Sequence, residues 1–213
     1  ADSVLYAAVI PSYGLWRSLK QFGEPEEHQV QCAAFSPDGT TIAMGCGDAT
    51  VKLWSVSGAK CIHNCKGHTD DVTAVGYCAG GGIFVSASAD KSLKLWSVSD
   101  GTCIKTLRRH TKPVSSLACS PDGQTIVSGS FDWTLKLWNV SAGEYVKTLQ
   151  GHNHVVTCVA FSPDGRSIAS GSIDQFVMVR SGAAHSTPMR VAPLTRRGSG
   201  LPITRPGPMS VLA

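Results

Sequence analysis

The sequence predicts an all-β protein made of about four copies of one small antiparallel sheet. Three observations predict it: markers that recur every 42 residues, short alternating apolar runs separated by turn residues, and 22 glycines against only 7% aromatic residues in 213. Short strands joined by tight turns use much glycine, whereas long helices do not. A hydrophobic share of 42% with 16% charged residues further indicates a globular chain with a core.

Three residue types keep the same period through the chain. Tryptophan, aspartate and histidine each recur at intervals of 42 residues, and a Ser-Pro-Asp-Gly turn sequence starts at Ser36, Ser120 and Ser162. Because independent markers stay in phase over several copies, the chain is predicted to be a repeat protein. The markers are Trp54, Trp96 and Trp138; Asp48, Asp90, Asp132 and Asp174; and His68, His110 and His152.

The second copy shows the strands of one unit in chain order. Residues 72–78 alternate between apolar and polar positions, glycines at 80–82 break the pattern, and residues 83–88 are rich in β-formers. After a turn, residues 93–98 alternate again, and residues 103–107 form a fourth short run. Four such strands make a small twisted sheet that cannot bury both faces alone, so successive copies are expected to stack around an axis as propeller blades.

The order of the markers within a unit is similar to that of a known family. Gly67-His68, then Asp90, then a Leu-Lys-Leu-Trp run that ends at Trp96 resemble the tryptophan-aspartate (WD) repeat family. The resemblance extends over residues 30–179, about four blades. It implies a WD-repeat β-propeller, and in this family the propeller commonly serves as a scaffold that presents partner proteins on its loops.

The chain departs from the family pattern in ways that affect the expected ring. Four blades are fewer than the number with which propellers of this family usually close, so we predict an incomplete or open propeller. Such a propeller would need a partner or further blades to complete the ring. The departures in sequence are Ser55, Ser97 and Asn139 after the tryptophans, Arg109 before His110, Glu26 in place of a histidine whose role His28 could take, and Arg180 in place of the fourth tryptophan.

The recurring polar residues are interpreted as a structural hydrogen-bond network within each blade. The aspartate is expected in the turn between the second and third strands, where it accepts from backbone amides and from the histidine. The histidine then reaches a serine and, through it, the tryptophan indole; we favour the serine four residues before the aspartate over the one two residues before it (Ser88, Ser130, Ser172). The predicted network residues are His68, Ser86, Asp90, Trp96, His110, Ser128, Asp132, Trp138, His152, Ser170 and Asp174, with Asp48 and Trp54 in the first copy, where Met44 and Cys46 are expected to break it.

Neither an enzyme nor a metal site is predicted. The sequence contains no nucleophile elbow, zinc-protease motif, phosphate loop or dinucleotide fingerprint, and polar residues that recur in every copy indicate structure rather than one catalytic centre. Cys61, His63 and Cys65 lie close together, but they align with ordinary core positions of other copies, so no zinc and no cofactor are expected. Eight cysteines without a predicted disulfide framework favour a reducing compartment, the cytoplasm or the nucleus. No membrane span or signal peptide is expected.

The chain is divided into three segments. Residues 1–29 are interpreted as a degenerate blade or a closing strand, and residues 30–179 as the blades. Residues 180–213 hold five arginines, five prolines and no acidic residue, which predicts a basic, disordered tail. The net charge of +4 is therefore a property of this tail.

The predicted function is that of a non-enzymatic protein-protein interaction scaffold, an adaptor subunit of a multiprotein complex. The alternative is a factor that associates with RNA or DNA through the basic C-terminal tail. The partner-binding side chains are expected where the copies differ, at the turns between the second and third strands and in the loops before the first. An alternative for the two aromatic turn residues is packing against a neighbouring blade. The candidates are Phe131, Trp133, Arg108, Arg109, Ile173 and Phe176.

Overall fold

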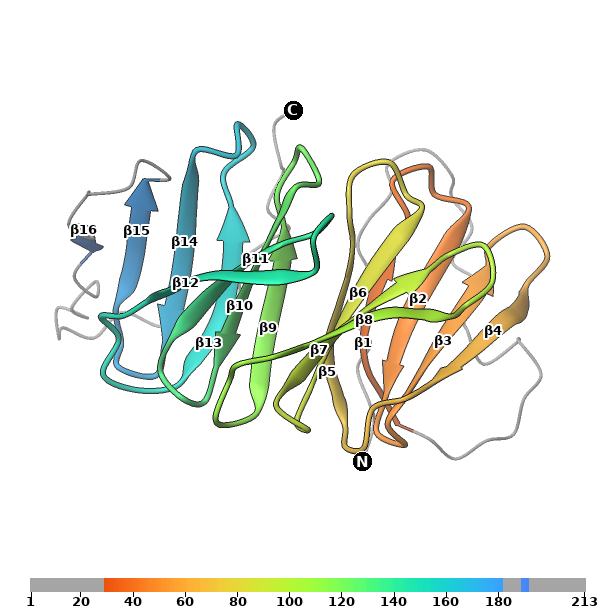
Figure 1. Ribbon diagram of the computed structural model, residues 1–213, viewed down its shortest axis with the longest axis horizontal. Helices are drawn as coiled ribbons and strands as arrows, with labels where there is room; N and C mark the ends of the chain where they lie inside the picture. The colour runs from red at the N-terminus through yellow and green to blue at the C-terminus, as the bar shows by residue number, and fades with distance from the viewer. Residues whose placement is uncertain (1–28, 182–188, 192–213) are drawn as a thin grey trace, which may run out of the picture.

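The computed structural model describes residues 29–181 and 189–191, which form four antiparallel sheets of four strands each (Figure 1). In every sheet the strands lie side by side in chain order. The first two sheets are β1 (Val30–Phe35), β2 (Thr41–Cys46), β3 (Thr50–Ser55), β4 (Lys60–Lys66), and β5 (Val72–Tyr77), β6 (Ile83–Ser88), β7 (Ser92–Ser97), β8 (Cys103–Arg108). The other two are β9 (Val114–Cys119), β10 (Thr125–Ser130), β11 (Leu135–Asn139), β12 (Glu144–Leu149), and β13 (Val156–Phe161), β14 (Ser167–Ser172), β15 (Val177–Ser181), β16 (Met189–Val191).

The turn between the second and third strands has the same backbone form in all four sheets. The residue after the aspartate has a positive φ each time: 66° at Ala49, 70° at Lys91, 71° at Trp133 and 71° at Gln175. This left-handed conformation is unfavourable for residues other than glycine and asparagine. The aspartate carboxylate stabilises each turn by accepting the N–H two residues ahead, at 2.9–3.0 Å.

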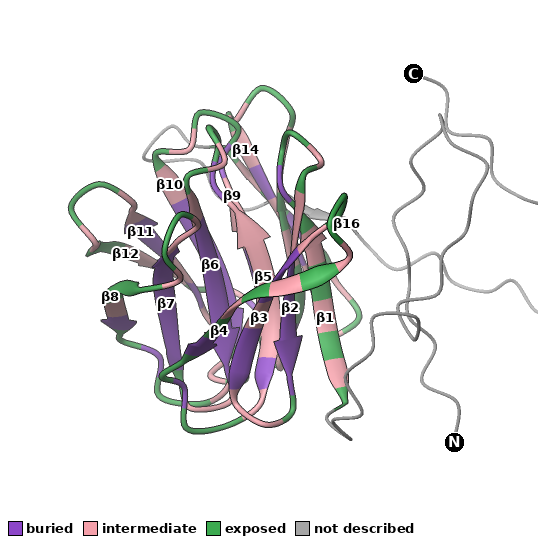
Figure 2. Ribbon diagram, turned by 90° about the vertical axis from the view of Figure 1, so that its right-hand side faces the viewer, coloured by how far each residue is buried: buried purple, intermediate pink, exposed green. Residues whose placement is uncertain are grey.

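The core lies between neighbouring sheets, so that each sheet is buried mainly by the next one. One face of the first sheet packs Leu53 and Val51 against Trp96 and Phe84 of the second, and equivalent clusters join the second to the third and the third to the fourth. The middle strands of the second and third sheets are the most completely buried (Figure 2). Apolar burial between blades is therefore the main stabilising contribution.

Hydroxyl groups on the first strands also connect successive sheets. Thr73 donates from Oγ1 to the carbonyl of Val114 at 2.6 Å, and Ser115 donates in the same way to the carbonyl of Val156. Thr157 stands at the equivalent position in the fourth sheet and donates to Gly171 O, at 3.2 Å, within its own sheet. In the fourth sheet the Thr157 hydroxyl thus lies at the position from which the second and third sheets bond to the following blade.

The first and fourth sheets lie at opposite ends of the arc, and the propeller is open (Figure 1). Val177 and Val179 of β15 are 46% and 36% exposed at positions where the inner sheets bury leucine. On the opposite end, Phe35 and Val56 are exposed as well. This observation confirms the predicted all-β fold with about four blades in an open arrangement.

The structure differs from the predicted boundary at residue 180. Strand β15 continues to Ser181, and β16 pairs with it antiparallel through Val177 opposite Val191. The fourth sheet therefore has four strands, because β15 pairs with β16, which lies inside the segment 180–213 whose composition indicates a tail. The other residues of 180–213 and the segment 1–28 lie outside the described residues, as do the interpretations placed on them.

Two of the cysteines are exposed to solvent. Cys103 and Cys158 are exposed, because Cys103 lies on an outermost strand and Cys158 faces the open side of the last sheet. In the part of the chain that the structure describes, no helix is long and apolar enough to cross a membrane.

Candidate functional site

Four predicted network residues of the second blade form one continuous hydrogen-bonded chain. His68 Nδ1 lies 2.8 Å from Asp90 Oδ2, and His68 Nε2 lies 2.7 Å from Ser86 Oγ. The Trp96 indole N–H donates to the same hydroxyl oxygen at 2.8 Å. Because the carboxylate can only accept, Nδ1 carries the proton, and neutral His68 accepts the serine hydroxyl proton at Nε2.

The third blade repeats this chain, and the fourth keeps most of it. His110 lies 2.8 Å from Asp132 and 2.8 Å from Ser128, which accepts from the Trp138 indole at 2.9 Å. In the fourth blade His152 bonds Asp174 at 2.8 Å and Ser170 at 2.9 Å, while Arg180 occupies the register position of the tryptophan and donates to Gln150 O.

The first blade has the same turn but a different interior. Asp48 accepts from the backbone and hydroxyl of Thr50, and Trp54 lies buried opposite Ile42, as Trp96 lies opposite Phe84. Met44 occupies the position of the network serine and has no hydroxyl to offer. Glu26 and His28 lie outside the described residues.

The serine two residues before each aspartate has another role. Ser88 donates to the carbonyl of Asp70 at 2.9 Å and accepts the backbone N–H of Asp90 at 3.0 Å. Ser130 and Ser172 make equivalent bonds, to the carbonyls of Lys112 and His154 and from the N–H groups of Asp132 and Asp174. These serines connect the turn to the loop before the first strand, and the earlier serine is the one that joins the histidine to the tryptophan.

Burial and hydrogen bonding set the ionisation of this network. Burial alone would raise the pKa of the Asp90 carboxyl, but hydrogen bonds from Ser92 and His68 outweigh it and lower that pKa to about 2. Burial lowers the pKa of His68, and the bond to Asp90 offsets only part of that shift. The pKa values of Asp132 and Asp174 are lowered too, again against the effect of burial. The network therefore favours a charged aspartate beside a neutral His68.

The free energy of unfolding is expected to fall in two steps as the solution is acidified. Because the folded-state pKa of His68 is below 6.5, the unfolded chain binds the proton more readily, and stability is lost as the pH falls below 6.5. Because the pKa of Asp90 falls from 3.8 to about 2 on folding, its contribution is complete above pH 3.8 and is lost toward pH 2. Urea unfolding at stepped pH measures both. His68→Gln should weaken the first step, and a stability that rises on acidification would contradict the assignment.

The network does not provide a catalytic triad, although it contains aspartate, histidine and serine. The side chains of His68, His110 and His152 are 0% exposed, and the Ser86 and Ser128 hydroxyls are completely buried and hydrogen-bonded to indole N–H groups. A substrate carbonyl cannot reach such an oxygen. Among the described residues, no group of three or more histidine, cysteine or acidic side chains is placed to hold a metal ion.

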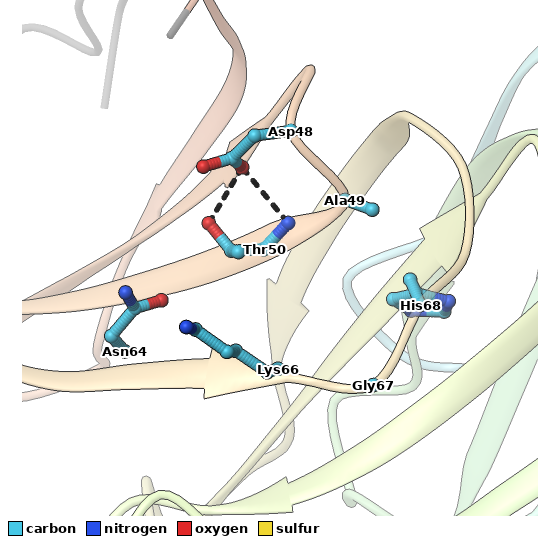
Figure 3. A pocket seen from close by; sticks show the side chains of 7 residues that line it. All are labelled: Asp48, Ala49, Thr50, Asn64, Lys66, Gly67 and His68. Carbon is cyan, nitrogen blue, oxygen red and sulfur yellow. Dashed lines mark hydrogen bonds between the residues drawn. The ribbon is translucent and has the colours of Figure 1, made fainter. Parts of the chain in front are cut away.

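The network joins the turn between the second and third strands of a blade to the loop that leads into that same blade. Beside it, a cleft lies between the turn of the first blade and the loop into the second, and another between the turn of the third blade and the loop into the fourth. Figure 3 shows the first cleft, of about 420 Å³, between Asp48–Thr50 and Lys66–His68. The equivalent cleft between the third and fourth blades measures about 450 Å³ and is lined by Trp133, Gln150 and Asn153, among others.

Five of the six predicted partner-binding side chains are exposed at this end. Phe131, Trp133 and Ile173 are 44%, 45% and 54% exposed, Arg108 and Arg109 are exposed, and Phe176 is half-buried. The Trp133 ring lies nearly parallel to that of His154, with centroids 6.2 Å apart, and Lys112 Nζ lies 5.6 Å from its centre. Trp133 thus contacts the loop before the next blade yet keeps almost half of its surface in solvent.

Two neighbours of Trp133 were not predicted from the sequence. Lys112 and His154 come from the loops before β9 and β13, and both lie against the ring of Trp133. Their signal in the sequence is weak, because loop residues differ in every copy. The Arg109 guanidinium lies 5.4 Å from the centre of the ring of Tyr145, which lies on β12, the outer strand of the third blade.

Stacked four-stranded sheets with this internal network define a protein of the β-propeller repeat class. The family model "WD domain, G-beta repeat" matches residues 16–55, 59–97, 101–139 and 143–181. The chain belongs to this family. Matches such as 59–97 begin with the last strand of one sheet and end with the third strand of the next, while the first begins inside the segment set apart as 1–29.

Curated relatives are similar to parts of this chain. A periodic tryptophan protein 2 homolog of Dictyostelium discoideum is 41% identical over 66 residues, 29% of this chain and 7% of that protein. Periodic tryptophan protein 2 of Arabidopsis thaliana is 33% identical over 75 residues, 34% and 8% of the two chains. An enhancer of mRNA-decapping protein 4 homolog of Drosophila melanogaster is 42% identical over 48 residues, 20% and 4%. The chain matches less than a tenth of the length of these relatives.

Proposed function

We propose that this chain is a non-enzymatic scaffold that binds partner proteins on one end of its blades. We call this end the turn face and define it by Lys91, Arg108, Arg109, Lys112, Phe131, Trp133, His154 and Ile173. The observation that carries the proposal is the exposure of large apolar side chains at turns that a buried hydrogen-bond network holds in place. Rigid presentation of exposed anchors is what a binding surface requires.

Trp133 is the proposed central anchor. Its backbone has a φ of 71°, which a bulky residue adopts at a cost in free energy and which tends to persist at functional positions. Its ring is held by His154 on one side and has Lys112 nearby, so it loses little conformational freedom on binding. Tryptophan and arginine are the side chains most often found at binding hot spots.

The charges around this anchor favour an acidic segment in the partner. Lys91, Arg108 and Arg109 are exposed around the junction of the second and third blades, and Lys112 follows in the next loop. The nearby carboxylates of Asp90 and Asp132 are already hydrogen-bonded to the buried histidines. We propose a partner segment that places an apolar side chain beside Trp133 and carboxylates near these cations.

The proposal also covers the kind of complex and the cellular compartment in which this scaffold acts. We propose an adaptor subunit of a multiprotein complex, supported by membership of a family built for interactions and by the exposed anchors. Eight free cysteines support the cytoplasm or the nucleus. Association with RNA or DNA through residues 180–213 stays the alternative, and most of that segment lies outside the described residues.

Trp133→Ala is expected to lower capture of partner proteins roughly tenfold or more while leaving the Tm unchanged. The ring is removed from an exposed site, so the interface loses its anchor and the core loses nothing. Quantitative mass spectrometry of proteins captured by the full chain, with thermal unfolding of each variant, measures both effects. An Arg108→Ala, Arg109→Ala double variant should weaken the same partners and reduce the salt dependence of their binding.

Ile104→Ala is the matched control for this experiment. Ile104 is 51% exposed on β8, toward the other end of the blade, so its removal should leave capture unchanged. A Trp133→Ala variant that melts earlier yet keeps its partners would contradict the proposal. Recovery that is nuclease-sensitive, survives Trp133→Ala and is lost on deletion of residues 192–213 would favour the nucleic-acid alternative.

A further inference from the structure

Two cysteine side chains from neighbouring blades meet inside the propeller. The Sγ atoms of Cys78 and Cys119 are 3.2 Å apart, and their residues are separated by 41 positions in the chain. Cys78 directly follows β5 of the second sheet, and Cys119 ends β9 of the third. Cys78 is only 3% exposed, whereas Cys119 is half-buried. The contact therefore crosses the interface between the two blades.

Both cysteines replace other residues of the repeat. At the position of Cys78 the other three sheets have Ser36, Ser120 and Ser162, whose hydroxyls accept the N–H that begins the second strand and donate to the aspartate of the turn. In the second sheet the turn lacks that aspartate and contains Gly80 and Gly81, both with positive φ.

The position of Cys119 is aromatic in the other sheets. Phe35, Tyr77 and Phe161 stand there, and in the inner interfaces such a ring fills the space beside the preceding blade. At the interface between the second and third blades, therefore, the small thiol of Cys119 replaces an aromatic ring, and the thiol of Cys78 that faces it replaces a serine hydroxyl. Two departures from the repeat that face each other across one interface indicate a pair with a joint role.

We propose that Cys78 and Cys119 form a reversible dithiol–disulfide site that cross-links the second and third blades when hydrogen peroxide or a related peroxide oxidises it. The Cys78 thiolate attacks one peroxide oxygen, the O–O bond breaks, and the departing hydroxide takes up a proton as water. The sulfur of Cys119 then attacks the Cys78 sulfenic acid, the S–O bond breaks, and the hydroxide leaves with the Cys119 proton as a second water. The two thiols lose two electrons, and the peroxide gains them.

The local environment supports this order of attack. The contact with the Cys119 sulfur lowers the pKa of the Cys78 thiol, even though burial opposes the shift. The same interaction and burial raise the pKa of Cys119. Cys78 is therefore the better thiolate and Cys119 the resolving thiol.

Oxidation of the full chain with hydrogen peroxide tests the site. After alkylation of the remaining thiols and proteolysis, mass spectrometry should find a peptide pair joined through Cys78 and Cys119 that has lost two hydrogens and separates on treatment with dithiothreitol. Because the cross-link restrains the unfolded chain, the oxidised protein should melt roughly 5–10 °C higher than the reduced one.

Cys78→Ser and Cys119→Phe are suited to this test because each restores the residue found in other blades. Either variant should fold and lose both the cross-linked peptide and the rise in Tm. Cys103→Ser, which removes an exposed thiol of β8, should retain both. If Cys78 and Cys119 remain alkylated as free thiols after oxidation, or if the rise in Tm persists in Cys78→Ser, the proposal is overturned.

Discussion

Trp96→Ala is expected to destabilise the protein by about 3–5 kcal/mol, the largest effect among the substitutions considered. Trp96 is 1% exposed and stacks on Phe84 with ring planes 12° apart, in the core between the first and second blades. Its removal leaves a cavity between two blades that meet mainly through such contacts, and it removes the indole donor to Ser86. Urea unfolding followed by far-UV circular dichroism measures the loss without relying on tryptophan emission.

Two further variants separate packing from hydrogen bonding at this site. Trp96→Phe keeps a ring but no N–H group, so it should cost clearly less than alanine. Trp133→Ala removes the same side chain from an exposed turn and should change stability little. If Trp96→Ala and Trp133→Ala have equal effects, burial between blades is not the main source of stability.

Asp132→Ala is expected to destabilise the protein by roughly 3 kcal/mol, because it leaves the buried His110 imidazole and the partly buried donors of the turn without their acceptor. The carboxylate accepts from His110 Nδ1 at 2.8 Å, from the backbone N–H groups of Thr111 and Thr134, and from the Thr134 hydroxyl at 2.6 Å. It also stabilises the turn in which Trp133 adopts a positive φ. Thermal and urea unfolding should both show the loss, and hydrogen exchange should show earlier opening of the loop at 109–113.

Asp122→Ala is the matched control, since it removes the same carboxylate from a turn at the other end of the same blade. Asp122 is exposed and accepts only from Ser120 and Gln124, so water can replace it as a partner and the effect should be much smaller. Asp90→Ala, in the equivalent turn of the second blade, should resemble Asp132→Ala. An Asp132→Ala protein with unchanged unfolding would refute the structural role of the network.

Much of the blade could be predicted because position in a repeat determines environment. The 42-residue period placed Asp90, Asp132 and Asp174 in equivalent turns, and each carboxylate accepts equivalent bonds in the structure. The period placed two serines before each aspartate at equivalent positions without choosing between them, and in the structure the favoured earlier one lies between histidine and tryptophan. The partner-binding role of the turn face remains a prediction.

Contacts between blades were harder to predict because they depend on the stacking of sheets. The period shows that Cys78 and Cys119 depart from the pattern, but it does not show that their sulfur atoms meet. Likewise, Trp133 was predicted as a turn residue, whereas its contacts with His154 and Lys112 depend on how two loops approach each other.

The sequence by itself determined the all-β class, the four-strand unit and the repeat length, and it placed the candidate residues of the internal networks. These features follow from local alternation, turn chemistry and periodicity, which act over short stretches of chain. Only the tertiary structure decided that β16 completes the fourth sheet, that the serine closer to the aspartate binds the loop before the first strand, and that Cys78 contacts Cys119. Those contacts join segments distant in sequence, and they form only after the burial of apolar faces has set the position of one blade against the next.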